Sequence, residues 1–325
     1  MDKKLYNTLS KVQLTEKLDS EEFVRLTCSF YKYINIKDPL KLRDELYIEL
    51  SNLGILGRIY VAKEGINAQI SVPEYQWEKL VTLINSNQYL KNIHINQAVE
   101  EGVSFYKLKI KIKNEIVAYG MEESSFDIQV TGKHLNSDEF NNELNKPDTI
   151  IVDMRNKYES EVGRFEGAIL PEVETSRELL PKVSKLLNGK EDKQVLLYCT
   201  GGIRCEKASS FLIKKGFKNV KQLKGGVINY ANEIKEKKLQ SKFIGKNFVF
   251  DARLGESITD DILGECYICK TPADKHGDCN NQMCHILFLA CEDCAKKFDG
   301  CCSNKCKEIA ALPIEKQRIL RRVKQ

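Results

Sequence analysis

The segment around Cys199 combines residue types that favour thiol chemistry. The apolar residues 195–198 predict a buried strand that ends at Cys199, and a helix is expected to begin near Arg204. The amino-terminal dipole of that helix, its free backbone N–H groups and the Arg204 guanidinium all favour a thiolate. We therefore expect the pKa of the Cys199 thiol to lie well below the free value of about 8.5.

A short glycine-containing loop links Cys199 to Arg204. Its residues are expected to surround the reactive sulfur: Thr200, Gly201, Gly202 and Ile203. The alternative is that Cys199 is a small apolar residue at the end of a core strand. Cys205 is a candidate resolving thiol for an oxidised or persulfidated Cys199, and its alternative is also a place in the core.

Nine of the twelve cysteines lie between residues 266 and 306, which favours metal binding over disulfides in a reducing compartment. Two Cys-x2-Cys pairs have the spacing of a four-sulfur zinc site: Cys266, Cys269, Cys291 and Cys294. A second, interleaved site is predicted from Cys279, Cys284, Cys302 and Cys306. Cys301 can exchange with Cys302, and His276 or His285 can replace a thiolate. Structural zinc is favoured, and an iron–sulfur cluster is the alternative.

A stripe of lysines alternates with apolar residues in the segment 104–120. The stripe consists of Lys107, Lys109, Lys111 and Lys113, and the opposite face consists of Leu108, Ile110 and Ile112. The lysines could follow RNA phosphates, or they could protect a sheet edge from aggregation. Tyr31, Tyr33 and Tyr60 are candidates for stacking a splayed base, and each could instead belong to the core.

The sequence contains no familiar oxygen-activating pattern. Its histidines, His94, His134, His276 and His285, do not have the spacing of a two-His-one-carboxylate iron site. No G-x-G-x-x-G motif for a flavin or a nicotinamide is present.

The elements that position these residues suggest three domains. In residues 1–128, the predicted order is a strand over 24–34, a helix over 39–54, two strands over 57–72 around a Glu64–Gly65 turn, a helix over 75–86 and a last strand over 104–120. This order is typical of a ferredoxin-like α+β sandwich.

Residues 129–238 alternate between strands and helices, which predicts an α/β domain with a mainly parallel sheet. The predicted strands cover 148–155, 195–199 and 219–226, a helix capped by Ser137 extends to Leu144, and another helix follows Gly202 and extends to Lys215. Residues 239–325 form the Cys-rich region.

Composition sets the broad class. An apolar content of 42% is ordinary for a globular protein and argues against a disordered or fibrous chain. The net charge of +5 is too small to establish a nucleic-acid partner. Because no segment approaches the roughly 20 apolar residues of a membrane span and no signal-peptide core is seen, we expect a cytoplasmic protein without a membrane partner.

The segments 153–169, 198–212 and 216–230 together resemble a rhodanese domain. This resemblance implies that Cys199 can carry a persulfide, and it places Asp153 and Arg155 near the mouth of the active site. Their alternative role is structural, with Asp153 fixing a loop and Arg155 pairing with Glu159 or Glu166. The four residues between Cys199 and Arg204 match sulfur-transferring rhodaneses, whereas related phosphatases use five.

The whole chain resembles the oxygen-dependent tRNA uridine hydroxylase family. The matching segments are KEGINAQIS at 63–71, CTGGIRCEKAS at 199–209 and NFVFDAR at 247–253. The resemblance implies hydroxylation of the wobble uridine of tRNA at C5 with dioxygen as co-substrate, and Cys199 is then the best candidate for the reactive centre. The alternative is a sulfurtransferase that uses a Cys199 persulfide and a sulfur or electron donor protein. A metal-bound RNA-binding adaptor without activity is a third hypothesis.

Overall fold

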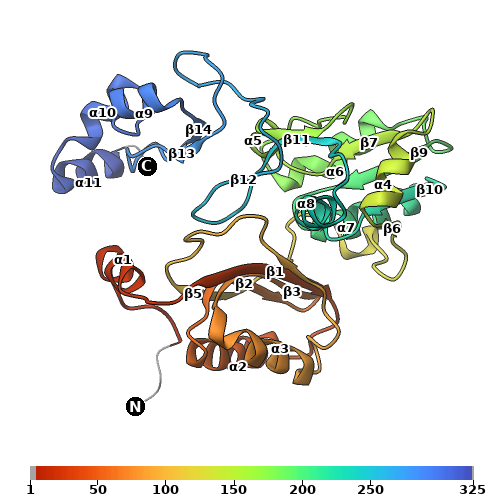
Figure 1. Cartoon of the computed structure of the whole chain (residues 1–325), viewed down its shortest axis with the longest axis horizontal. Coiled ribbons are helices and arrows are strands. Elements are labelled where there is room, and N and C mark those ends of the chain that lie inside the picture. Colours follow the sequence, from red (N-terminus) through yellow and green to blue (C-terminus); the bar gives the residue numbers. More distant parts are fainter. Residues whose placement is uncertain (1–4, 324–325) are drawn as a thin grey trace. The chain divides into compact units, whose positions relative to one another are not determined.

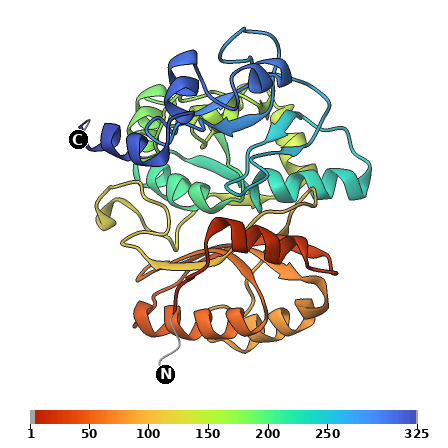
Figure 2. The same ribbon diagram turned by 90° about the vertical axis from the view of Figure 1, so that its left-hand side faces the viewer.

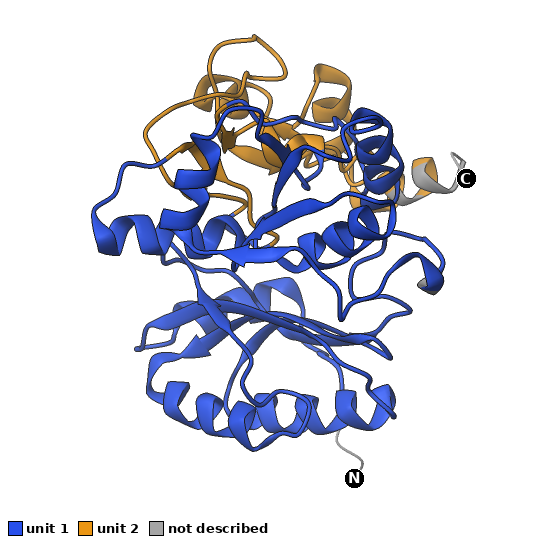
Figure 3. Cartoon of the chain, turned by 90° about the vertical axis from the view of Figure 1, so that its right-hand side faces the viewer, with its two compact units in different colours: residues 1–156, 167–241, 251–253 blue, residues 157–166, 242–250, 254–325 orange. Residues whose placement is uncertain are grey.

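The structure is a computed structural model that describes residues 5–323. It divides into two compact units (Figure 3). Unit 1 contains the residues up to 156, 167–241 and 251–253. Unit 2 contains residues 157–166, 242–250 and those from 254 onward. Among the described residues, none of the helices is both long and apolar enough to cross a bilayer.

The first half of unit 1 is an α+β sandwich. Its elements are α1 (Lys11–Asp19), β1 (Arg25–Tyr33), α2 (Pro39–Asn52), β2 (Leu56–Ala62), β3 (Gly65–Pro73), η1 (Glu74–Gln76), α3 (Trp77–Ser86), β4 (Ile95–Gln97) and β5 (Leu108–Ile112). The sheet order is β4-β1-β3-β2-β5, with the first four strands antiparallel and β5 parallel to β2. Helices α2 and α3 run along the same face of the sheet (Figures 1 and 2). The predicted ferredoxin-like sandwich is confirmed.

The last strand of the sandwich differs from the prediction over 104–120. The fourth strand of the ferredoxin-like order is β4, not the segment at 104–120. The lysine-bearing β5 is an additional strand of only five residues at the edge of the sheet. Three residues are too few to establish an alternating pattern, so β4 leaves no clear signal in the sequence. At this edge the predicted apolar face is buried only in part: Leu108 and Ile110 are buried, whereas Ile112 is 46% exposed.

The second half of unit 1 is an α/β domain. Its elements are η2 (Glu123–Ser125), β6 (Lys133–Leu135), α4 (Ser137–Leu144), β7 (Ile150–Asp153), α6 (Ser176–Leu186), β9 (Gln194–Tyr198), α7 (Ile203–Lys214), β10 (Asn219–Leu223) and α8 (Gly226–Lys237). The sheet has the order β6-β10-β9-β7, and every neighbouring pair is parallel. Leucines and valines of α6 pack with α7 and the sheet in one buried cluster. The predicted parallel sheet is confirmed.

The amino-terminal cap of α4 is Asn136, one residue before the predicted Ser137. The Asn136 side chain accepts from the backbone N–H of Glu139, and the Glu139 carboxylate accepts from the Asn136 N–H. This reciprocal capping box satisfies two backbone donors at once. Ser137 is instead the first residue inside the helix.

Unit 2 is built from short elements around the cysteines. They are α5 (Lys157–Ser160), β8 (Gly163–Phe165), β11 (Phe243–Asn247), β12 (Glu256–Ser257), β13 (His276–Asp278), β14 (Leu287–Leu289), α9 (Glu292–Lys297), α10 (Asn304–Ala310) and α11 (Ile314–Val323). Strand β8, from the middle of the chain, pairs antiparallel with β11. Two of its small buried clusters consist largely of cysteine side chains, so this unit has little apolar core of its own.

Candidate active site

Cys199 lies directly after β9, in a loop that turns into α7. The backbone N–H of Gly202 donates to Cys199 Sγ at 3.1 Å, and the Cys199 side chain is 1% exposed. Within the loop, Arg204 Nη2 donates to Thr200 Oγ1 at 3.2 Å. Strand, loop and helix are therefore arranged as the sequence predicts, with the sulfur held by the loop backbone.

The surroundings of Cys199 favour its ionised form. Burial acts to raise the pKa of this thiol, but a hydrogen bond from Cys205, the charge of Arg204 and backbone N–H groups of the loop outweigh it. The net effect lowers the pKa of Cys199 to about 6. At neutral pH the sulfur is therefore mainly a thiolate, which is the nucleophilic form of cysteine.

Cys205 is the hydrogen-bonding partner of Cys199 and is completely buried at the start of α7. Burial raises the pKa of Cys205 well above its ordinary value, and the neighbouring Cys199 adds to this increase. The two sulfurs are thus unequal. At neutral pH the Cys205 thiol stays protonated, whereas the Cys199 thiol is mainly ionised.

The amino terminus of helix α8 donates hydrogen bonds to the loop. The backbone N–H groups of Val227 and Ile228 donate to the carbonyl oxygens of Cys199 at 3.0 Å and Thr200 at 3.1 Å. This contact requires a glycine at position 226, which has φ +66°, because a Cβ there would lie 2.5 Å from the Cys199 carbonyl oxygen. The amino terminus of α8 therefore fixes the carbonyl side of the loop.

Gly226→Ala is expected to distort the loop and to lower the free energy of unfolding by about 2 kcal/mol or more, because positive φ and a backbone clash are both unfavourable for alanine. Denaturant unfolding and the alkylation rate of Cys199 measure the two effects. Gly277→Ala is the matched control, since a Cβ at position 277 meets nothing within 4 Å and φ is not positive there. Equal stability of the two variants would contradict the prediction.

Asp153 and Arg155 are buried beneath the loop, with Arg155 Nη2 2.7 Å from Asp153 Oδ2. The Tyr198 hydroxyl donates to the same Asp153 oxygen at 2.7 Å. Because Tyr198 immediately precedes Cys199, this pair fixes the end of β9. Both side chains are at most 1% exposed, as is Cys199, so their place near the mouth of the active site stays a prediction.

The helix-free face of the first sheet contacts the loop, a relation that sequence analysis misses. The Tyr31 hydroxyl donates to Glu206 Oε1 at 2.8 Å, and the Tyr33 hydroxyl donates to the Ile203 carbonyl at 3.3 Å. From β4, Asn96 Nδ2 donates to the Gly201 carbonyl at 3.4 Å. Two of the three tyrosines considered for base stacking, Tyr31 and Tyr33, therefore have their hydroxyls engaged at the first turn of α7, directly after the loop.

Glu206, in the first turn of α7, has further polar partners besides Tyr31. Gln222 Nε2 donates to Glu206 Oε2 at 2.8 Å, and His134 Nε2 lies 2.8 Å from Glu206 Oε1. Burial acts to raise the pKa of Glu206, but these partners and Tyr31 lower it overall. A charged carboxylate is thus held beside the loop by neutral and basic groups.

A second connection joins two of the motifs seen in the sequence. Lys207, in the motif at 199–209, places Nζ 2.8 Å from Glu64 Oε2 and 2.9 Å from Glu115 Oε2. Glu64 belongs to the motif at 63–71, and its other oxygen accepts from the Ile116 backbone N–H at 2.7 Å. The buried ammonium is therefore matched by two partly exposed carboxylates.

The four predicted lysines lie at the outer edge of the first sheet, with Lys109 and Lys111 in β5 and Lys107 and Lys113 flanking it. All four are exposed, and in residues 5–323 none of them has a carboxylate ion-pair partner. The charge of Lys111, followed by partial burial and the charge of Lys107, lowers the pKa of Lys109. Tyr60 lies opposite Lys111 in the register, and Lys113 Nζ is 5.3 Å from the centre of its ring.

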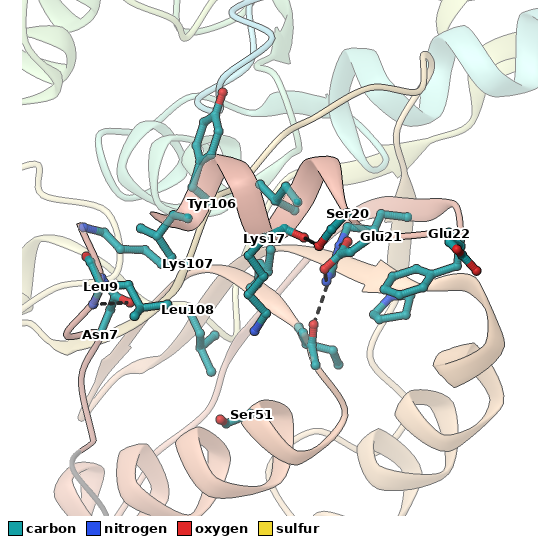
Figure 4. A pocket seen from close by; sticks show the side chains of 18 of the residues that line it. Asn7, Leu9, Lys17, Ser20, Glu21, Glu22, Ser51, Tyr106, Lys107 and Leu108 are labelled. Carbon is teal, nitrogen blue, oxygen red and sulfur yellow. Dashed lines mark hydrogen bonds and ion pairs between the residues drawn. The ribbon is translucent and has the colours of Figure 1, made fainter. Parts of the chain in front are cut away.

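A pocket of about 630 Å³ lies in the sandwich, away from the loop (Figure 4). It is lined by α1, the second half of α2, the starts of β1, β2 and β5 and the end of β3, and its cationic residues include Lys17 and Lys107. None of its lining residues belongs to the Cys199 loop. This pocket is therefore not evidence for where chemistry occurs.

The clustered cysteines of unit 2 form two groups that could hold metal ions. The groups are Cys266, Cys269, Cys291 and Cys294, and Cys279, Cys284, Cys302 and Cys306, which are the two sets that the spacing predicts. In each group the sulfurs lie within 4.8 Å of one another. Cys301 is in neither group, and within the described residues neither His276 nor His285 joins them.

The sulfur separations suit a tetrahedral metal site. Cys269 Sγ is 3.6 Å from Cys291 Sγ, and Cys284 Sγ is 3.7 Å from Cys302 Sγ. Four sulfurs at zinc–sulfur distances of about 2.3 Å would be about 3.8 Å apart. All the cysteines are free thiols, so no disulfide competes for these sulfurs.

Comparison with known proteins identifies the family. The chain is 47% identical over 321 residues to the tRNA uridine(34) hydroxylase of Leptospira interrogans, covering 98% of this chain and 88% of that protein. The chain belongs to the tRNA uridine(34) hydroxylase family. The proteins of the same name from Photorhabdus laumondii and Yersinia pestis are 46% and 48% identical, covering 98% and 97% of this chain and 91% and 89% of theirs. The predicted family resemblance is confirmed, and membership of the tRNA uridine(34) hydroxylase family makes the chain an enzyme.

Three family descriptions match successive parts of this tRNA uridine(34) hydroxylase family member. They are the UPF0176 acylphosphatase-like domain at residues 25–116, the rhodanese-like domain at 136–233 and the rhodanese C-terminal region at 244–307. Among solved structures, a rhodanese-like domain protein from Staphylococcus aureus is 24% identical, covers 30% of this chain and 90% of its own, and has a TM-score of 0.26.

Proposed function

We propose that this chain hydroxylates the wobble uridine of tRNA at C5, with dioxygen as co-substrate and Cys199 as the reactive centre. The observation that supports a chemical role for Cys199 is its stabilisation as a thiolate by the loop N–H groups, Arg204 and Cys205. A thiolate is a suitable nucleophile for C6 of a uracil ring, and addition there makes C5 electron-rich. A base would approach over Gly201, because the space beside this residue is open.

The test is a reaction with purified chain, unmodified tRNA, dioxygen and a thiol reductant, followed by mass spectrometry of the nucleosides. The expected product is 5-hydroxyuridine at the wobble position, with an oxygen atom that comes from labelled dioxygen. Label arriving from water, or a change at another position, would overturn the proposal. Cells that lack the gene provide the complementary comparison, provided no parallel pathway operates.

A sulfurtransferase is the second candidate, favoured by the match to the rhodanese-like domain and by the four-residue loop. In that case Cys199 would carry a persulfide, supplied or received by a donor protein. Transfer of sulfur from thiosulfate to cyanide, lost in Cys199→Ser, would support it. Absence of a persulfide on Cys199 after incubation with thiosulfate would argue against it.

We assign tRNA contact to the lysine-bearing edge of the first sheet. Lys107, Lys109, Lys111 and Lys113 form an exposed stripe without carboxylate partners among the described residues, and Tyr60 lies beside it. Their mutual repulsion, seen at Lys109, would be relieved by a polyanion.

The double variant Lys109→Ala with Lys111→Ala is expected to bind tRNA more weakly and with less dependence on salt, because each lost phosphate contact reduces the slope by about 0.7 to 0.9. Filter binding over a salt series measures both quantities. The control is Lys182→Ala with Lys185→Ala, which removes two exposed charges from α6. If both pairs behave alike, or if the β5 variant only aggregates, the stripe protects the sheet edge instead.

We propose that both cysteine groups of unit 2 bind structural zinc. All eight ligand positions are sulfurs, which leaves no protein oxygen or nitrogen at either group and matches closed structural sites. Bound zinc would supply the folding energy that the small apolar clusters of this unit do not. No step of the reaction is assigned to it.

Elemental analysis is expected to find two zinc ions per chain and a colourless protein. Cys266→Ser should lose one of the two ions and lower the melting temperature, because three sulfurs hold zinc less tightly. Cys301→Ser is the matched control and should keep both, since Cys301 is in neither group. Brown protein with visible absorbance would indicate an iron–sulfur cluster instead.

The remaining parts of the proposal concern organisation and location. We assign residues 1–128 to tRNA contact, 129–238 to the reactive loop and 239–325 to metal binding. Action on tRNA is consistent with a cytoplasmic enzyme, and fractionation of cells with an antibody against the chain would test this.

A further inference from the structure

The proposed hydroxylation assigns no chemical step to one buried thiol beside the reactive centre, namely that of Cys205. This side chain is completely buried in the first turn of α7 and belongs to the same core cluster as Cys199. The Cys205 backbone N–H donates to the Gly202 carbonyl at 3.0 Å, and the Gly202 N–H donates to Cys199 Sγ at 3.1 Å, so the same turn carries both thiols. A cysteine that only fills space does not require a second sulfur as its neighbour. The juxtaposition places two free thiols of different protonation at the end of one strand.

Electron counting defines a task for a second thiol. Dioxygen accepts four electrons when one of its atoms enters the product and the other becomes water. Conversion of the C5–H bond into C5–OH supplies two of them. Two more electrons and two protons must come from elsewhere, and oxidation of two thiols to a disulfide supplies that number.

We propose that Cys199 and Cys205 act together as a redox-active dithiol that supplies the two electrons for hydroxylation and ends each cycle as a disulfide. The proposal rests on the proposed function above. The external reductant is then a dithiol that returns this disulfide to two thiols.

The first half of the cycle uses Cys199 as nucleophile. Its thiolate forms a bond to C6 of the uracil ring, and the electron pair of the C5–C6 double bond moves to the C5 enolate. Reaction of C5 with dioxygen and a proton gives a C5 hydroperoxide. Two electrons of the ring have then passed to oxygen, and the C6–S bond remains.

The second half uses Cys205 as reductant. Its sulfur attacks the distal oxygen of the hydroperoxide, the O–O bond breaks, C5 keeps a hydroxyl group and Cys205 becomes a sulfenic acid. C5 then loses its hydrogen as a proton while the C6–S bond breaks, which restores the double bond and releases the Cys199 thiolate. Attack of this thiolate on the sulfenic acid forms the disulfide and, with one proton, water.

The net reaction balances: uridine, dioxygen and two thiols give 5-hydroxyuridine, water and one disulfide. The asymmetry of the pair suits this sequence of steps. Cys199 is ionised and can add to the ring first, whereas Cys205 retains the proton that it delivers when the peroxide bond breaks.

The decisive experiment is a reaction without added reductant, with tRNA in excess over the full-length chain in air-saturated buffer. The expected result is a yield that stops at one 5-hydroxyuridine per chain, with a Cys199–Cys205 disulfide found by peptide mass spectrometry. Adding a dithiol should restart turnover. Continued turnover without reductant, or completed reaction with both thiols still free, would overturn the inference.

A variant provides the second arm. Cys205→Ala is expected to lose product formation without reductant, whereas Cys28→Ala, which changes another buried cysteine in unit 1, should match the unaltered chain. Thermal unfolding of each variant identifies loss of folding, and disulfide mapping in the unaltered chain remains decisive in that case. If the unaltered chain makes no 5-hydroxyuridine even with a dithiol, the proposed function itself fails. If it does and Cys205→Ala matches it, only the dithiol inference fails.

Discussion

Cys199→Ser is expected to abolish formation of 5-hydroxyuridine, with a loss of roughly 10³-fold or more, as is found when a covalent nucleophile is removed. A serine hydroxyl stays protonated at neutral pH and cannot replace the thiolate that the loop stabilises. Nucleoside mass spectrometry after reaction with tRNA measures the loss. Binding of tRNA should be unchanged, because the substitution removes no positive charge.

The pH dependence of alkylation provides an independent check on Cys199. Its pKa of about 6 means that the thiolate fraction, and with it the reaction with iodoacetamide, is largely preserved from pH 8 to pH 7 and falls as the pH drops below 6. Cys28 is the internal reference, because burial raises its pKa to about 12. A Cys199 that reacts no faster than Cys28 at neutral pH would remove the physical basis of the proposed chemistry.

Lys207→Met is expected to lower the free energy of unfolding by about 3 kcal/mol, near the lower end of the range for breaking a buried ion pair. The substitution leaves Glu64 and Glu115 facing each other without the buried ammonium between them. Their partial exposure keeps the effect from being larger. Denaturant unfolding of unit 1, followed by tryptophan fluorescence from Trp77, measures the change.

Two comparisons make this prediction specific. Lys218→Met breaks the ion pair with Asp192, in which both side chains are largely exposed, and should change stability little. Adding Glu64→Gln and Glu115→Gln to Lys207→Met should recover part of the lost stability, because the uncompensated carboxylates are then gone. Equal effects of Lys207→Met and Lys218→Met would contradict a structural role for the buried pair.

Local patterns were sufficient to predict the fold class. The strand, turn and helix around Cys199 depend on neighbouring residues in the chain, and the spacing of Cys266, Cys269, Cys291 and Cys294 is itself a local signal. Alternation of strands and helices likewise predicts a parallel sheet without knowledge of its partners. These features agree with the structure because each is determined by the sequence of one continuous segment of the chain.

Long-range contacts at the loop were not predictable in the same way. The hydrogen bond from Asn96 to Gly201 depends on β4, which is too short to detect, and on pairing between residues 105 positions apart. The close approach of Gly226 to the Cys199 carbonyl depends on how α8 meets the sheet. The motifs that contain Glu64 and Lys207 were both visible, but their pairing was not, because periodicity says nothing about which distant charges meet.

The bonds from Tyr31, Tyr33 and Lys207 make the sandwich part of the loop's scaffold. A rhodanese-like segment excised from this chain would lose both carboxylates that pair with its buried lysine, Glu64 and Glu115, and the Tyr31 hydroxyl that donates to Glu206. Transfer of the segment into another protein would therefore require the contacting residues of the sandwich to be transferred as well. Exchange of modules between such enzymes is constrained accordingly, and substitutions on the sandwich face must be matched by substitutions on α7.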